Sequence, residues 1–343
     1  MDEDTKAGHA GRALLYCPLE SASVCWQVGV VTLSAKEASM RDSLQSYMKV
    51  GIVHFMAFPD CMKGEGPIYD TLTKIVEDDF FSAVEITWIK DPAERKRVKN
   101  LLAASHMTVG YGAQPCLLSQ KLNLNAFDPV ERKKAVDQVK ACTDEAAEVG
   151  AGAVAVLSGV DPGERREEAM KLLLDSLREL AGYAKQRGLR FILESFDSKY
   201  DKKCLIGPAK DALAVCRALR KDFPDFGIMV DLSHLPIQEE SPKKSLGTLK
   251  KPNIAHIHIG NAVKQQGHSL YGDQHPRFGT PGGENDVPQL VEFLRALLEI
   301  GYLTKGKGPR PVVAFEVRPW GEETSGAVIA NAKRTLMEAW ARA

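Results

Sequence analysis

The sequence predicts an α/β fold, a (β/α)8 TIM barrel in a single domain with an N-terminal extension. Three observations carry this prediction. From Met48 to the C-terminus, short apolar segments and longer helical segments alternate eight times. The short segments are mostly apolar, as in a parallel sheet covered by helices. The length of this part of the chain is close to the roughly 250 residues of a typical barrel with insertions.

Strands are expected where short apolar runs stand between helical segments, at residues 50–55, 83–88, 106–111, 152–157, 189–194, 226–231, 253–259 and 311–317. Helices are expected to follow them, at residues 68–76, 91–105, 130–149, 163–186, 208–221, 241–249, 286–299 and 323–341. Two helices have a clear start, because Asp91-Pro92 and Asp128-Pro129 place a capping carboxylate before a proline. Gly150 supplies an end for the second of these helices, and the helix at 163–186 has apolar residues at helical spacing.

A doubly wound open sheet is the alternative architecture. Such a fold normally carries a glycine fingerprint for phosphate after its first strand, and the corresponding segment here, AFPDCMKGEGP at 57–67, does not fit. Residues 1–47 match the barrel pattern poorly. We therefore expect the barrel to span 48–343 and residues 1–47 to be an extension, disordered or an upstream-start artefact. A helix docked over one end of the core is the alternative for this segment.

Composition favours a cytoplasmic enzyme. Lysine plus arginine and aspartate plus glutamate both number 45, so no excess of positive charge indicates a nucleic-acid partner. No apolar run approaches the roughly 20 residues that span a bilayer, so no membrane partner is expected. The start MDEDTKAGHAGR lacks the pattern of a signal peptide. The seven scattered cysteines, without a CxxC pair, fit reduced thiols.

Four consecutive predicted strands deliver an ionisable residue at their C-terminal ends: Glu194, Asp231, His258 and Glu316. In a barrel these ends lie at the face that carries the active site. A carboxylate removed from water costs several kcal/mol, so three carboxylates with an imidazole indicate a shared cation. The oxygen-rich set favours one six-coordinate divalent ion, Mn²⁺ first, with Mg²⁺, Co²⁺ or Zn²⁺ as alternatives.

Such a site predicts proton transfer next to a carbonyl group. Four protein ligands leave positions for a substrate hydroxyl and carbonyl oxygen, and the ion would act as a Lewis acid that stabilises an enediolate. Glu194 and Glu316 lie on strands separated by two others, so they can flank a bound substrate. We expect both to be catalytic acid/base groups as well as metal ligands.

These strand ends resemble those of the xylose-isomerase-like sugar epimerases and isomerases, which include the ketose 3-epimerases. The matching segments are LES at 193–195, DLSHLPIQEE at 231–240, HIHIGN at 256–261 and FEVRP at 315–319. The resemblance covers the chain from about residue 48. It implies Glu194 and Glu316 as the acid/base pair and His234 as a substrate contact. Two positions depart from the 3-epimerase pattern, which has Glu in place of Tyr200 and Arg in place of Lys264.

Other residues near the strand ends are candidates for binding a small carbohydrate. The long loop at 260–285 directly follows a metal ligand, and we expect it to be a substrate lid. His256 points to the same face as His258 but one layer deeper, and packing is the alternative role for it and for Trp88. The predicted substrate-binding residues are His234, Lys264, His256, His275, Arg277, Trp88 and Arg318.

The leading functional prediction is a divalent-metal-dependent sugar isomerase or epimerase. A lyase or dehydratase of the same superfamily, acting on a keto-inositol or a 3-keto-glycoside, is the alternative because the first step is shared. An endonuclease-IV-like nuclease would need several histidine-bound zinc ions and a basic groove, which the neutral chain disfavours. A non-enzymatic sugar-binding barrel is disfavoured by the intact acid/base pair, and a homo-oligomer is compatible with the sequence.

Overall fold

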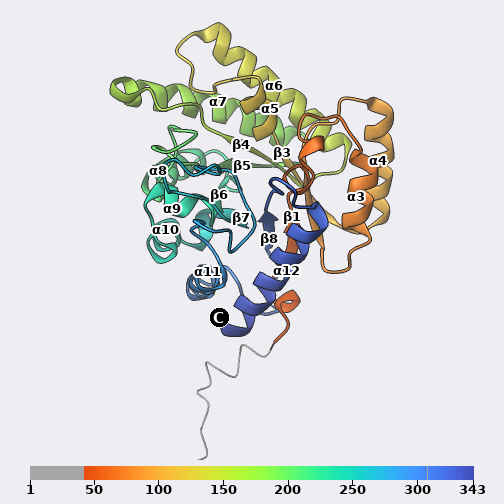
Figure 1. Ribbon diagram of the computed structural model, residues 1–343. Coiled ribbons are helices and arrows are strands. Elements are labelled where there is room, and N and C mark those ends of the chain that lie inside the picture. Colours follow the sequence, from red (N-terminus) through yellow and green to blue (C-terminus); the bar gives the residue numbers. More distant parts are fainter. Residues whose placement is uncertain (1–41, 307) are drawn as a thin grey trace, which may run out of the picture. The chain divides into compact units, whose positions relative to one another are not determined.

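The computed structural model describes residues 42–306 and 308–343. Within them, eight parallel strands form a nearly closed barrel inside an outer ring of helices (Figure 1). The predicted TIM barrel is confirmed. Most of the predicted N-terminal extension, residues 1–41, lies outside the described residues. Its last residues form the short helix η2 (Leu44–Ser46), after which the Tyr47 ring packs edge-on against Trp340 with ring centroids 5.1 Å apart.

The strands pair in the order β1-β8-β7-β6-β5-β4-β3-β2. β1 and β2 approach each other through a bridge between Val53 and Glu85 and a 2.9 Å hydrogen bond from the Ser82 N–H to the Val50 carbonyl. The described strands are β1 (Lys49–Ile52), β2 (Ala83–Ile86), β3 (Thr108–Gly112), β4 (Ala153–Leu157), β5 (Arg190–Glu194), β6 (Gly227–Asp231), β7 (Ile254–Gly260) and β8 (Val312–Glu316).

The main helices follow the strands as expected: α3 (Ile68–Val76), α4 (Pro92–Ala104), α6 (Pro129–Glu148), α7 (Arg166–Gln186), α8 (Ala209–Leu219), α10 (Pro242–Leu249), α11 (Val287–Glu299) and α12 (Ser325–Arg342). Asp91 and Asp128 cap α4 and α6 by accepting hydrogen bonds from backbone N–H groups, which confirms both predicted starts. None of the described helices is both long and apolar enough to cross a membrane.

Short helices in the loops were not predicted. They are α2 (His54–Ala57), η3 (Pro59–Cys61), α5 (Gln114–Ser119), α9 (His234–Gln238) and η5 (Lys251–Asn253). A further short helix, η4 (Gly163–Arg165), forms the start of the segment 163–186 that was predicted to be helical. The first strand was expected to reach residue 55 but ends at Ile52, because the chain turns into α2 after Val53. The third strand begins at Thr108 and not at 106, since His106 has a φ of 58°, outside the β region.

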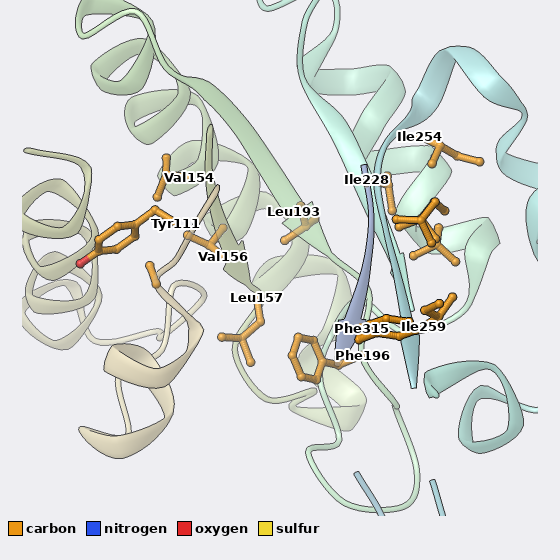
Figure 2. Close-up of a cluster of buried hydrophobic side chains, with 14 of the residues drawn as sticks. Tyr111, Val154, Val156, Leu157, Leu193, Phe196, Ile228, Ile254, Ile259 and Phe315 are labelled. Carbon is orange, nitrogen blue, oxygen red and sulfur yellow. The ribbon is translucent and has the colours of Figure 1, made fainter. Parts of the chain in front are cut away.

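Side chains alternate between the two faces of each strand. Val154, Val156 and Leu193 belong to the large core cluster that the strands share with the surrounding helices (Figure 2). The alternate residues Ala155, Ile192 and Met229 form a separate small cluster. Two residues further along β5 and β6 from this cluster stand Glu194 and Asp231. The pattern that builds the core thus turns ionisable side chains inward at one end of the barrel.

Candidate active site

The four predicted metal ligands meet at the C-terminal end of the barrel. Glu194, Asp231 and Glu316 are the last residues of β5, β6 and β8, and His258 lies two residues before the end of β7. One donor atom from each of the four lies within 4.8 Å of the other three. Glu194, Asp231 and His258 are at most 3% exposed. The sequence therefore places the four side chains correctly around one buried point.

Glu194 and Asp231 each have one carboxylate oxygen fixed by a neighbour. The Gln114 amide donates to Glu194 Oε2 (2.7 Å), and the Ser233 N–H donates to Asp231 Oδ1 (2.7 Å). The second oxygens, Glu194 Oε1 and Asp231 Oδ2, are buried and have no hydrogen-bond partner in the described part of the chain. Buried carboxylate oxygens without partners are costly. A divalent cation bound between them would remove that cost, so the residues present fit such an ion.

Glu85 is a member of the site that the sequence reading missed. Its carboxylate accepts hydrogen bonds from Nε2 of both His256 (2.7 Å) and His258 (2.9 Å). A β-carbon at Gly110 would lie 2.9 Å from Glu85 Cγ, so this glycine makes room for the carboxylate. Donation from His258 Nε2–H fixes the ring and leaves Nδ1, 2.6 Å from Glu316 Oε2, as the nitrogen available to a cation. The available signal was a lone charge inside the apolar run AVEITW.

The carboxylates repel one another, and their pKa values are driven apart. Burial, together with the charge of Glu316, raises the pKa of Glu194 to about 8. Burial also raises the pKa of Asp231. For Glu316 burial acts in the same direction, but the positive charges of His275 and His258 outweigh it and lower the pKa to about 2. Opposed pKa shifts in two neighbouring carboxylates are typical of acid/base sites.

A second cluster of buried polar side chains, His234, His275 and Asp273, lies beside the four candidate metal ligands. Both His234 Nε2 (3.0 Å) and His275 Nε2 (2.8 Å) lie against Asp273 Oδ1. His234 Nδ1 also faces an acceptor, the Ser195 carbonyl at 2.9 Å. Because both ring nitrogens of His234 face acceptors, the ring carries two protons, and the negative charges of Asp273 and Asp231 raise its pKa well above the usual value although burial opposes this. His234 is thus a positive charge beside the ligand cluster.

A cavity of about 340 Å³ opens at this cluster. Its polar lining includes Glu194, His258 and Glu316, with Asp273, Gln274 and His275 from the loop predicted as a lid. Glu85, Gln114 and Ser119 add further polar groups. Other lining side chains are apolar or basic: Phe55, Met56, Met62, Pro115, Leu118, Phe196, Lys63, Lys202 and Arg318. The helices α2 and α5 supply several of the apolar residues, so the loop structure that the sequence did not predict shapes the cavity.

The predicted substrate-binding residues have different placements. His275 and Arg318 line the cavity, and His234 and His256 contact its carboxylates. Three others make contacts elsewhere. Lys264 Nζ lies 3.8 Å from Glu284, Arg277 Nε pairs with Glu323 at 2.8 Å, and the Trp88 indole N–H donates to the Met62 carbonyl at 3.1 Å. Substrate binding by all seven residues stays a prediction.

The fold and the site together define a (β/α)8 barrel with an oxygen-rich candidate metal centre at the C-terminal ends of its strands. The chain belongs to the xylose isomerase-like TIM barrel family, whose model matches residues 76–324. This assignment agrees with the resemblance found at the strand ends.

Solved structures with the same fold include several sugar-converting enzymes. A D-tagatose 3-epimerase-like protein is 20% identical with a TM-score of 0.63, over 85% of this chain and 98% of that one. The IolI protein with a bound zinc atom is 18% identical with a TM-score of 0.66, over 86% and 99%. A 3-keto-D-glucoside 4-epimerase from E. coli is 19% identical with a TM-score of 0.60, over 84% and 99%. At such identities the likeness establishes the fold alone, and no curated protein matches the chain in sequence.

Proposed function

We propose that this protein is a divalent-metal-dependent isomerase or epimerase of a small carbohydrate with a carbonyl group. The observation that carries the proposal is the shared arrangement of Glu194, Asp231, His258 and Glu316, whose donor atoms lie within 4.8 Å of one another. The related epimerases and the zinc atom in the IolI structure support the same chemistry and a divalent ion. Mn²⁺ is the ion we expect first.

The four ligands would hold the ion, which when bound supplies Lewis acidity toward neighbouring substrate oxygens and stabilises an enediolate. The chain itself supplies the proton transfers. Glu194 and Glu316 project from strands that β6 and β7 separate, so a substrate lies between the two carboxylates. One carboxylate removes the proton from the carbon next to the carbonyl, and the other returns a proton to the opposite face. Gln114 holds Glu194 Oε2, so Oε1 is the oxygen that faces the ion and the substrate beside it.

A lyase acting on a 3-keto-glycoside is the second candidate. The apolar lining of the cavity, which includes Phe55, Met56 and Leu118, favours it because an aglycone packs against such side chains better than sugar hydroxyls do. Proton removal by the same carboxylates would begin either reaction. Product analysis separates the two, since loss of an aglycone or of water excludes simple isomerisation.

The proposal is tested by metal analysis followed by turnover in D₂O. Protein dialysed against Mn²⁺ and then against metal-free buffer should retain about one ion per chain. A screen of keto-sugars and keto-inositols with the loaded protein should then yield a substrate whose product carries deuterium next to the carbonyl. A chain that retains no divalent ion contradicts the proposal, and a product without deuterium indicates a hydride shift or an internal proton return.

A further inference from the structure

Arg318 is a cation in the cavity that has no anionic partner in the described part of the chain. It follows Glu316 by two residues, and both side chains line the cavity. Arg318 Nε is buried and has no hydrogen-bond partner among residues 42–306 and 308–343. The guanidinium lies over the Trp320 ring, 4.4 Å from its centroid, and the backbone N–H of Arg318 donates to the His275 carbonyl at 2.7 Å. The side chain is therefore held in place, but its charge is not balanced by these contacts.

Two other basic residues near the cavity are paired. Lys202 Nζ lies 2.7 Å from Asp201 and 3.5 Å from Asp273, and Arg277 pairs with Glu323. Glu316, the nearest carboxylate along the chain, is engaged as well, since it lies against His258 and His275. A partly desolvated guanidinium without an anion is unfavourable, and stacking on an aromatic ring offsets only part of that cost. An anion bound in the cavity would balance the charge of Arg318.

The rest of the cavity also points to an ionic contact with the substrate. Lys264 and Tyr200 do not line it: Lys264 lies near Glu284, and the Tyr200 hydroxyl donates to Glu239 at 3.3 Å. Phe55, Met56, Met62, Pro115 and Leu118 offer no side-chain hydrogen bonds to sugar hydroxyls. An arginine presents a planar fork of donors that binds a carboxylate or a phosphate through two parallel hydrogen bonds. One such contact orients a substrate along this apolar side of the cavity.

We propose that Arg318 binds an anionic group of the substrate, so that this enzyme acts on an acidic keto-sugar and not on a neutral ketose. The anionic group is a carboxylate or a phosphate, which the guanidinium binds in the same way. The inference rests on the proposed function, because the carbonyl end of the substrate is taken to lie at the four ligands. Because Arg318 follows Glu316 by only two residues, the anionic group at Arg318 and the carbonyl group at the four ligands can belong to one small substrate molecule.

The test compares three ketoses that differ only at carbon 6: D-fructose, D-fructuronate and D-fructose 6-phosphate. Calorimetry with the Mn²⁺-loaded protein should show one of the acidic ketoses binding roughly tenfold to a hundredfold more tightly than D-fructose, as expected for hydrogen bonds to charged groups. The tighter acidic ketose also identifies the anion as carboxylate or phosphate. Equal affinity for all three, or failure of both acidic ketoses to bind, overturns the inference.

Variants of Arg318 assign the preference to this residue. Arg318→Gln should abolish the difference in affinity between acidic and neutral ketoses, while Mn²⁺ affinity and Tm stay at wild-type values. Arg318→Lys should restore part of this affinity difference. Arg178→Gln, at a half-exposed position on the outer helix α7, is the matched control and should keep the full affinity difference. If the affinity difference between acidic and neutral ketoses is unchanged in Arg318→Gln, the inference is overturned. Failure of the proposed function is distinguishable, since it would appear in the wild-type protein as absence of Mn²⁺ binding or of turnover.

Discussion

Glu85→Gln should weaken metal binding although Glu85 is not itself one of the four ligands. The carboxylate accepts hydrogen bonds from His258 Nε2 at 2.9 and 3.0 Å and from His256 Nε2 at 2.7 Å. Glutamine keeps the shape, and its one acceptor oxygen can still face both rings, which meet the same oxygen of Glu85, but it carries no charge and therefore holds His258 less strongly. Loss of such a partner behind a ligating histidine typically reduces metal affinity 10- to 100-fold. We expect a loss in binding free energy of about 1.4–2.7 kcal/mol.

The assay is a calorimetric titration of EDTA-stripped protein with Mn²⁺. Glu299→Gln, an exposed position at the end of α11, serves as the charge-matched control and should leave the dissociation constant unchanged. Circular dichroism and Tm before metal addition show whether Glu85→Gln still folds. An unchanged Mn²⁺ affinity in a folded Glu85→Gln protein would refute the idea that Glu85 orients His258 for a cation.

Two further predictions concern the acid/base pair and a buried histidine. Glu194→Gln and Glu316→Gln should each lower kcat by roughly 10²–10⁴-fold, measured on the substrate from the screen; unchanged turnover in either would reassign its role. His54 is buried with Nε2 at 2.8 Å from Thr71 Oγ1, and burial lowers its pKa to about 3. Since the unfolded chain binds this proton below pH 6.5 and the folded chain does not, stability should fall as pH drops from 6.5 toward 3, by up to about 1.4 kcal/mol per pH unit from this group. Urea unfolding at several pH values should show a flatter profile for His54→Gln, and parallel profiles would contradict the assignment.

The strand ends were predictable because two independent patterns agree there. Apolar runs of four to six residues predict buried parallel strands, and the barrel topology brings the ends of consecutive strands to one face. Glu194, Asp231 and Glu316 end such runs, so their convergence followed from the fold without any knowledge of side-chain geometry. His258 could be assigned in the same way, since β7 places it beside Asp231 in the register of the sheet.

The contacts of Glu85 and the apolar wall of the cavity could not be predicted, because tertiary packing determines both. Glu85 lies on β2, which does not neighbour β7 in the strand order. Its contacts with His256 and His258 therefore cross the barrel interior and depend on how closely the barrel closes. A charge in the strand AVEITW gives no information about its partner. The α2 and α5 helices have too few residues for a periodic pattern. Tertiary packing determines these elements, and with them the apolar side of the cavity.

The balance of charge around the ligands gives a physical reason for a cation at this point. Glu85 and Glu316 are held charged by histidines, and the pKa of each lies well below its usual value although burial alone would raise it. His258 faces a carboxylate with each ring nitrogen, and the charges of Glu85 and Glu316 raise its pKa well above normal against the effect of burial.

In the chain alone, therefore, protons on His258 and on Glu194 balance the negative charge. A divalent ion held by the four residues, as proposed, would do so more completely, because its charge would act on several carboxylates at once. It also leaves the Nε2–H of His258 on Glu85. Under the proposed function, Glu194 and Glu316 would then be available for proton transfer to and from the substrate.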